Sequence, residues 1–311
     1  MGMIERAFCS CCVVAVSLSA GCGQTSADRS DDGRLPVFAG IPPLAYLVEQ
    51  IGGPHVAVEV LVQPGQDPHT FEPTPRQVSA LSRARLFFQI GMPFENALLA
   101  KLRQNTPQMT VVDVAAGVEK RTMDEPCRRH AAGHDHNHPD QRGEPDPHVW
   151  LSPPLLKVQA ENVAAALVRA DPAHADDYER NLAALLGRID AVHRRIERML
   201  APYRGRSFYV FHPGFGYFAD AYGLEEKAIE AGGRSPAPKQ LRALIERAWS
   251  EGVKTVFVQP QFDPHGARAI AEAIGGKVVP IDGLAKNVLY NLENIAAKIE
   301  RSFIGQKIAG G

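Results

Sequence analysis

Residues 172–200 constrain the fold more than any other part of the chain. Their apolar side chains recur at alternating spacings of three and four residues: Ala175, Tyr178, Leu182, Leu185, Ile189, Val192, Ile196 and Met199. This spacing predicts one continuous helix with a single apolar stripe, with Asp171 as its N-cap and Pro172 in its first turn. At 1.5 Å per residue the helix would be about 43 Å long. We interpret it as a rigid backbone that runs across two lobes.

On both sides of this helix, β-rich runs alternate with helical stretches. Before it we expect strands at residues 36–39, 56–62, 85–90 and 110–114, and helices at 43–51, 74–84 and 154–170. After it we expect strands at 207–211, 254–259 and 277–281, and helices at 216–222, 238–250, 267–274 and 291–303. This alternation is typical of parallel sheets. The sequence therefore predicts an α/β protein with two parallel-sheet lobes, residues 35–170 and 204–311, joined by a linking helix at 171–203.

The N-terminus has the pattern of a targeting segment. Residues 1–22 predict a secretory signal peptide, because the apolar run at 7–20 is shorter than the about 20 residues that span a bilayer. The sequence LSAGC at residues 18–22 resembles a bacterial lipobox, which predicts a lipid anchor on Cys22. Cleavage after Ala20, giving a soluble periplasmic protein, is the alternative. The polar residues 23–34 predict a flexible tether between anchor and fold.

Composition excludes two further features. Three of the five cysteines lie within the signal peptide and Cys22 would carry lipid, so only Cys127 remains and no intramolecular disulfide is expected. The formal net charge of −1 argues against a nucleic-acid partner, because proteins that bind nucleic acids usually carry an excess or a patch of basic residues.

Four residues of the type that binds metals lie near strand ends. His69 comes after the strand at 56–62, His212 directly follows the strand at 207–211, His148 precedes an apolar run, and Asp282 follows the strand at 277–281. Ligands bind at the carboxyl ends of strands in open parallel sheets. Three imidazoles and one carboxylate suit zinc, whereas manganese favours more oxygen ligands. We therefore predict a metal site in the cleft between the lobes. Taken singly, a histidine at a strand end is more often a hydrogen-bonded surface residue, and Asp282 is also explained as the start of a turn.

The tripeptide Asp-Pro-His occurs three times, ending at His69, His148 and His265. We exclude His265 from the site, because Asp263-Pro264 begins a predicted helix and places this histidine in the first turn. The aspartates before His69 and His148 either orient their imidazoles from behind or form plain turns.

Residues 122–146 form a histidine-rich insertion in the first lobe, with almost no apolar side chains. Two interpretations remain open for its histidines, namely an auxiliary, low-affinity zinc collector or a solvated loop. These histidines are His130, His134, His136 and His138.

Six segments together resemble the cluster A-I solute-binding proteins of bacterial zinc and manganese ABC importers. They are QPGQDPHTFEPTP, DPHVWLSP, FHPGFGYFADAYGL, SPAPKQL, FVQPQF and IDGL. The resemblance runs from about residue 35 to the C-terminus and implies metal binding between two α/β lobes that a long helix joins. It also implies that His69, His148 and His212 are ligands and that Asp282 completes the site, although some zinc-specific members lack this aspartate. Manganese-binding members tend to carry glutamate in the place of His212.

We therefore expect a high-affinity, extracytoplasmic zinc receptor. It would be a monomer anchored to a bacterial membrane by its N-terminal lipid, and it would deliver zinc to the permease and ATPase of an ABC importer. The alternatives are a manganese receptor of the same family and a zinc hydrolase with Glu72 as its base. We expect no enzymatic activity, because the sequence shows no HExxH element, nucleophile elbow or phosphate loop. Zinc binds neutral imidazoles, so its affinity should fall as the pH drops through about 6.5.

Overall fold

The computed structural model describes residues 33–102, 108–123, 145–230 and 237–304. The expected signal peptide, most of the tether, Cys22 and the four histidines of the insertion lie outside the described residues. None of the helices within the described ranges is both long enough and apolar enough to cross a membrane.

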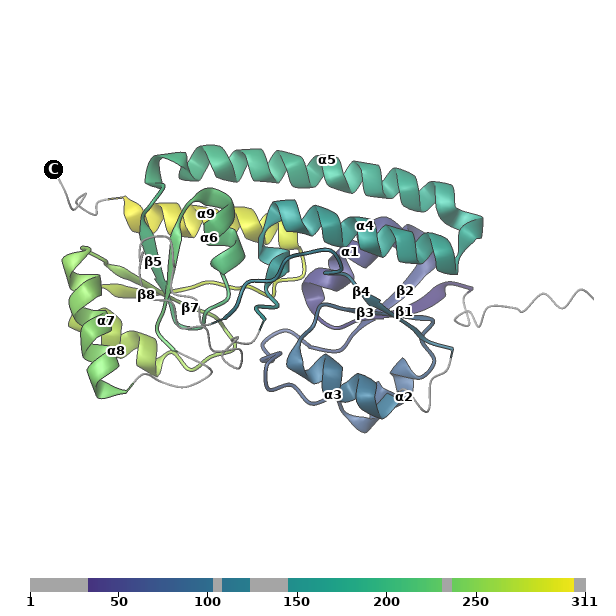
Figure 1. Ribbon diagram of the computed structural model, residues 1–311, viewed down its shortest axis with the longest axis horizontal. Helices are drawn as coiled ribbons and strands as arrows, with labels where there is room; N and C mark the ends of the chain where they lie inside the picture. Colours follow the sequence, from purple (N-terminus) through teal and green to yellow (C-terminus); the bar gives the residue numbers. More distant parts are fainter. Residues whose placement is uncertain (1–32, 103–107, 124–144, 231–236, 305–311) are drawn as a thin grey trace, which may run out of the picture.

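The N-terminal lobe is built on a four-stranded parallel sheet in the order β2-β1-β3-β4. Its strands are β1 (Leu35–Ala39), β2 (Val56–Val60), β3 (Leu86–Gln89) and β4 (Thr110–Asp113). Its helices are α1 (Pro42–Gly52), α2 (Pro75–Leu81), α3 (Pro93–Leu102) and α4 (Pro153–Ala170). Figure 1 shows α1 and α4 on one side of this sheet and α2 and α3 on the other.

The C-terminal lobe repeats this arrangement with a second four-stranded parallel sheet, in the order β6-β5-β7-β8. Its strands are β5 (Ser207–Val210), β6 (Glu225–Ala228), β7 (Thr255–Val258) and β8 (Lys277–Pro280). Its helices are α6 (Gly216–Tyr222), α7 (Pro238–Ser250), α8 (His265–Ala273) and α9 (Val288–Phe303). In both sheets the second strand lies on one side of the first and the third on the other. This change of direction makes a topological switch point, where open parallel sheets bind ligands.

The long helix α5 (Ala175–Leu200) joins the lobes, as the apolar stripe predicts. Its 26 residues correspond to about 39 Å. It packs against α1 and α4 of the first lobe and α9 of the second, and Figure 1 shows it running along both. Six of its side chains are buried in this contact: Tyr178, Leu185, Ile189, Val192, Ile196 and Leu200.

The start of the linking helix differs from the prediction. Pro172–His174 form a short 3-10 turn (η4), and α5 begins only at Ala175. The Asp171 carboxylate makes no capping bond to a backbone N–H; it bonds instead to the His174 ring and accepts a bond from the Tyr178 hydroxyl. The α-helix is therefore three residues shorter than the predicted helix at 172–200.

Two elements were missed by the sequence analysis, and both lack a clear apolar pattern. The buried side chains of helix α3 lie on one face, but that face includes the charged Glu95 and the exposed face carries Ala97 and Ala100, so the apolar contrast is weak. Strand β6 has the sequence EEKA, which is poor in strand-forming residues, and it forms because its backbone pairs with β5 at the sheet edge. The predicted strands agree with the observed ones to within one or two residues at each end.

Candidate metal centre

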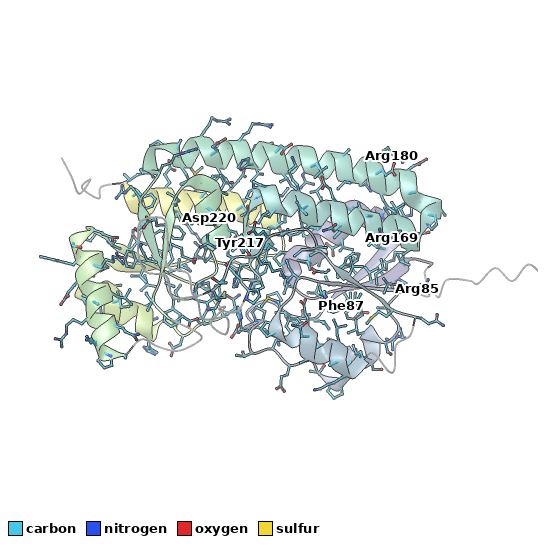
Figure 2. All side chains as sticks on the ribbon, viewed as in Figure 1. Arg85, Phe87, Arg169, Arg180, Tyr217 and Asp220 are labelled. Carbon is cyan, nitrogen blue, oxygen red and sulfur yellow. The ribbon has the colours of Figure 1, made fainter. Side chains whose placement is uncertain are left out.

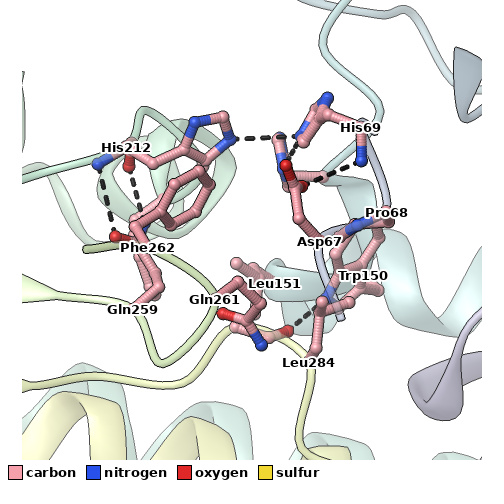
Figure 3. A pocket seen from close by; sticks show the side chains of 14 residues that line it. Asp67, Pro68, His69, Trp150, Leu151, His212, Gln259, Gln261, Phe262 and Leu284 are labelled. Carbon is pink, nitrogen blue, oxygen red and sulfur yellow. Dashed lines mark hydrogen bonds between the residues drawn. The ribbon is translucent and has the colours of Figure 1, made fainter. Parts of the chain in front are cut away.

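The structure brings His69, His148 and His212 together from three distant parts of the chain. One ligand atom from each residue lies within 4.8 Å of the others. The His69 Nε2 atom is 3.4 Å from the His148 Nε2 atom and 3.1 Å from the His212 Nε2 atom. Figure 3 shows the rings of His69 and His212 meeting across the pocket. Two imidazoles therefore come from the first lobe and one from the second.

The spacing of the nitrogens fits a single metal ion. Four ligands placed tetrahedrally at Zn–N distances of about 2.0–2.1 Å lie about 3.4 Å apart. The two separations measured from His69 are close to this value, so one ion can contact the three nitrogens with little movement of the rings.

His69 lies in the loop between β2 and α2, and its position is set by local hydrogen bonds. The Asp67 carboxylate accepts bonds from the His69 backbone N–H (2.9 Å) and from the Thr70 hydroxyl (3.0 Å). Asp67 thus forms a plain turn and does not bond to the His69 ring. At the end of the loop, Thr74 and Gln77 form a capping box that begins α2.

His148 lies immediately before a short 3-10 turn, η3 (Val149–Leu151). The Asp146 carboxylate accepts bonds from both the backbone N–H (2.9 Å) and the ring Nδ1 (2.7 Å) of His148. Proton donation from Nδ1 leaves the Nε2 lone pair free to bind a metal. Burial disfavours the Asp146 anion, but His148 and Arg121 outweigh it and hold the pKa of this carboxyl below its usual range. Of the two open interpretations, the orienting role is therefore correct for Asp146 and the turn is correct for Asp67.

His212 follows the end of β5 and is held by two neighbouring strands. Its ring Nδ1 bonds to the Glu230 carboxylate, which is buried just beyond β6. At the end of β7, the Gln259 side chain accepts from the His212 backbone N–H (3.3 Å) and donates to its carbonyl (2.7 Å). The Phe262 ring stacks on the imidazole, with centroids 4.6 Å apart. Sequence reasoning missed Glu230, because the strand that places it beside His212 was not predicted.

The environment of the cluster favours the neutral form of the His69 and His212 imidazoles. Burial, together with the neighbouring His148 and His212 rings, lowers the pKa of His69 to about 3. Burial also lowers the pKa of His212, although its bond to Glu230 acts in the opposite direction. Neutral imidazoles are the form that binds divalent metals.

The fourth predicted ligand, Asp282, is not part of this cluster. Its carboxylate accepts a bond from the Leu284 backbone N–H (2.8 Å), and its carbonyl accepts one from Asn291 (2.6 Å). These bonds are those of the turn that was the alternative interpretation. His265 is exposed in the first turn of α8, where its backbone N–H bonds to the Asp263 carboxylate, and it takes no part in the cluster, as expected.

Apolar side chains from both lobes surround the three imidazoles in a single pocket. Its walls include Trp150, Leu151, Phe215, Phe262 and Leu284. The Trp150 indole N–H, from the first lobe, donates to the Gly283 carbonyl of the second (2.7 Å). The pocket therefore keeps the imidazoles largely away from water and connects the two lobes directly.

Known proteins share both the sequence pattern and this architecture. The family model described as ZnuA, zinc-uptake complex component A periplasmic, matches residues 37–298. The solved "Crystal structure of ZnuA" superposes with a TM-score of 0.78 at 37% sequence identity, and the match covers 86% of this chain and 99% of that one.

Two curated relatives carry the names of different metals. The high-affinity zinc uptake system protein ZnuA of Paracoccus denitrificans is 29% identical over 267 residues, which cover 76% of this chain and 79% of that protein. The manganese ABC transporter substrate-binding lipoprotein PsaA of Streptococcus pneumoniae is 26% identical over 306 residues, which cover 90% and 94%. The chain therefore belongs to the periplasmic ZnuA family, whose members are metal-binding components of ABC transporters and not enzymes.

Proposed function

We propose that this protein is a zinc receptor that captures the ion between its lobes and delivers it to the permease and ATPase of an ABC importer. The observation that carries the proposal is the cluster of three imidazole nitrogens, two of them backed by carboxylates on Nδ1. His69, His148 and His212 are the proposed ligands.

The choice of zinc over manganese rests on the chemistry of the donors. Among the described residues, the only cluster suited to a metal contains nitrogen ligands alone. Imidazole suits zinc, whereas manganese prefers carboxylate, carbonyl and water oxygens. The nearby carboxylates of Asp146 and Glu230 bond to the far nitrogens of the rings, so they act on the ion through the imidazoles. In this proposal water or the Asp282 carboxylate, one oxygen of which accepts the Leu284 backbone N–H, fills the fourth position.

Three further parts of the proposal concern residues outside the described ranges. A lipid on Cys22 would anchor the protein, as a monomer, to the membrane that carries the importer, and residues 23–34 would act as its tether. His130, His134, His136 and His138 would collect zinc weakly near the cleft. The "lipoprotein" in the names of several relatives supports the anchor.

The test is a competition between the two metals. Metal-free protein is titrated with zinc and with manganese against a chelator of known affinity, and crystals grown in equal amounts of both are examined by anomalous scattering at each absorption edge. We expect one zinc ion to bind tightly to the three imidazoles and manganese to bind at least about 100-fold more weakly. Such a difference needs only a small free-energy preference for zinc, since each factor of ten corresponds to about 1.4 kcal/mol. Manganese on the imidazoles in the presence of zinc would refute the proposal.

A further inference from the structure

The hydroxyl of Tyr217 bridges the two lobes directly behind the metal centre. Tyr217 belongs to α6 of the C-terminal lobe and is buried. Its hydroxyl accepts a bond from the Arg121 backbone N–H (2.8 Å) and donates one to the Asp146 carbonyl (3.0 Å). Both of these partners belong to the N-terminal lobe, and Figure 2 shows Tyr217 near the middle of the molecule, beside Asp220.

The two segments that Tyr217 contacts are themselves paired. The Asp146 backbone N–H donates to the Arg121 carbonyl (2.8 Å), and Thr122 and Pro145 form an antiparallel bridge next to this bond. The hydroxyl therefore closes a ring of backbone hydrogen bonds that includes Asp146. A tyrosine hydroxyl is protonated at neutral pH, and burial raises the pKa of Tyr217 further, to about 12.

Asp146 connects this ring of bonds to the metal centre. Its carbonyl is held by Tyr217, while its carboxylate holds both the backbone N–H and the ring Nδ1 of His148. A shift of Asp146 would turn the His148 imidazole, because the ring follows the carboxylate to which it donates. The opposite lobe thus fixes the orientation of an imidazole that belongs to the first lobe.

We infer that Tyr217 is a positioning residue that holds His148 in its metal-binding orientation and makes this orientation depend on the contact between the lobes. The inference rests on the proposed function, since it assumes that His148 is a ligand. When the lobes separate, Asp146 loses the hydroxyl and His148 loses its fixed support. Lobe opening then weakens the metal site through the loss of this support as well as through the greater distance to His212.

A second contact at the same place allows a sharp control. The Arg121 guanidinium pairs with Asp220 of α6, but the Asp220 side chain is half exposed. Solvent-exposed ion pairs contribute little, and truncation of Asp220 removes the pair while it keeps both the Arg121 backbone N–H on which Tyr217 depends and the Arg121 charge near Asp146. The ion pair and the hydroxyl bridge can therefore be removed separately.

The central experiment compares Tyr217→Phe with Tyr222→Phe in the full chain. Both tyrosines are buried in α6, but the Tyr222 hydroxyl bonds to His193 of α5 (3.2 Å), away from the metal centre. Zinc affinity is measured by chelator competition, and zinc dissociation by rapid mixing with excess chelator. We expect Tyr217→Phe to weaken zinc binding about 10-fold, as is typical for groups that support ligands, mainly through faster dissociation. Tyr222→Phe and Asp220→Ala should change affinity less than about twofold, which is the small effect expected away from the support.

A measurement on the unmodified protein avoids any effect of substitution on folding. Coupling between two sites is reciprocal, so bound zinc should strengthen the bridge as much as the bridge strengthens zinc binding. Hydrogen exchange of the Arg121 amide should therefore slow about 10-fold on zinc binding, by this reciprocity. The Leu224 amide serves as the control, because it bonds to the Ala219 carbonyl within the C-terminal lobe. Its exchange rate should change much less on zinc binding.

Several outcomes would overturn the inference. These are equal losses in Tyr217→Phe and Tyr222→Phe, an Asp220→Ala loss as large as that of Tyr217→Phe, or Arg121 amide exchange that zinc does not alter. If the unmodified protein failed to bind zinc at the three imidazoles, the proposed function itself would be wrong. Normal zinc binding with an unaffected Tyr217→Phe variant would refute only the role of Tyr217.

Discussion

The two lobes share one strand order but hold their metal-binding histidines in different ways. In the first lobe, His69 and His148 each follow an aspartate by two residues, and that aspartate bonds to the histidine backbone N–H. In the second lobe, His212 is held by Glu230 and Gln259, which lie 18 and 47 residues further along the chain. The first lobe therefore builds its ligand loops from local sequence, and the second builds its ligand position from the sheet.

This difference bears on how the site can open. His212 lies directly beyond β5 and is fixed through the ends of β6 and β7, so it moves only with its lobe. His69 lies in a loop nine residues beyond β2 and is fixed mainly by its own turn. We expect the second lobe to act as the rigid side of the site and the first lobe to supply the adjustable ligands.

The largest expected effect is the loss of an imidazole from the rigid side. Structural zinc sites contribute about 10–16 kcal/mol in total, so one of four ligands is worth about 3–4 kcal/mol. His212→Ala should therefore weaken zinc binding by about 100- to 1,000-fold, since each factor of ten corresponds to about 1.4 kcal/mol. Chelator competition measures this loss.

Two controls accompany His212→Ala. His265→Ala alters an exposed side chain on α8 and should leave zinc affinity unchanged. Asp282→Asn keeps an oxygen that can accept the Leu284 N–H, so a small effect is expected if Asp282 serves only its turn. A loss as large as that of His212→Ala would show that the Asp282 carboxylate reaches the ion. Equal losses for His212→Ala and His265→Ala would contradict the assignment of the site.

The next effect compares the supports of the two lobes. Glu230→Gln removes the charge that bonds to the His212 ring, and such changes typically cost about 10- to 100-fold in metal affinity. Asp67→Asn should cost less than about threefold, because asparagine can form the same turn and Asp67 does not bond to the His69 ring. Zinc titrations of both variants test the contrast. Similar losses in the two variants would show that Glu230 and Asp67 support their histidines equally, contrary to what the hydrogen bonds indicate.

The same contrast explains how much could be predicted from the sequence. Both sheets, the long helix and the three clustered histidines were predicted, because apolar periodicity and Asp-Pro-His turns are local signals. Of the two aspartates considered as supports, Asp146 could not be preferred over Asp67 from the sequence, because both stand two residues before a histidine. The choice depends on whether the carboxylate reaches the ring or only the backbone, and that is settled by the packing around each loop.

The residues that sequence reasoning missed depend on pairing between distant segments. Glu230 contacts His212 only because β6 pairs with β5, and the EEKA sequence of β6 gives no strand signal. Tyr217 looks like an ordinary apolar residue of α6 until Arg121 and Asp146 are placed at its hydroxyl. For Asp282, its place after a strand predicts a ligand, while its carboxylate accepts a turn bond from the Leu284 backbone N–H, so its part in the site stays a prediction.

The smallest expected effect is a difference in pH dependence between the lobes. The pKa of His69 is lowered to about 3 by burial and by the neighbouring imidazoles, from about 6.5 in the unfolded chain. Between these values the unfolded chain binds more protons, so His69 costs stability as the pH falls below 6.5 and costs nothing above it. Compared with a His69→Gln variant, the metal-free protein should lose about 1 kcal/mol of unfolding free energy between pH 7 and pH 5.5.

The counterpart experiment on the second lobe sharpens this result. The pKa of His212 is also lowered by burial, but its bond to Glu230 favours the protonated ring and reduces the shift. The difference between His212→Gln and the unmodified protein should therefore change less with pH than the difference for His69→Gln. Urea unfolding at pH 7 and pH 5.5, without metal, measures both differences. Parallel pH profiles for the unmodified protein and His69→Gln would show that proton binding at His69 is not opposed by folding. Zinc would then compete with protons near pH 6.5, as it does at an isolated imidazole. Burial of the cluster would in that case not protect zinc binding in mildly acidic surroundings.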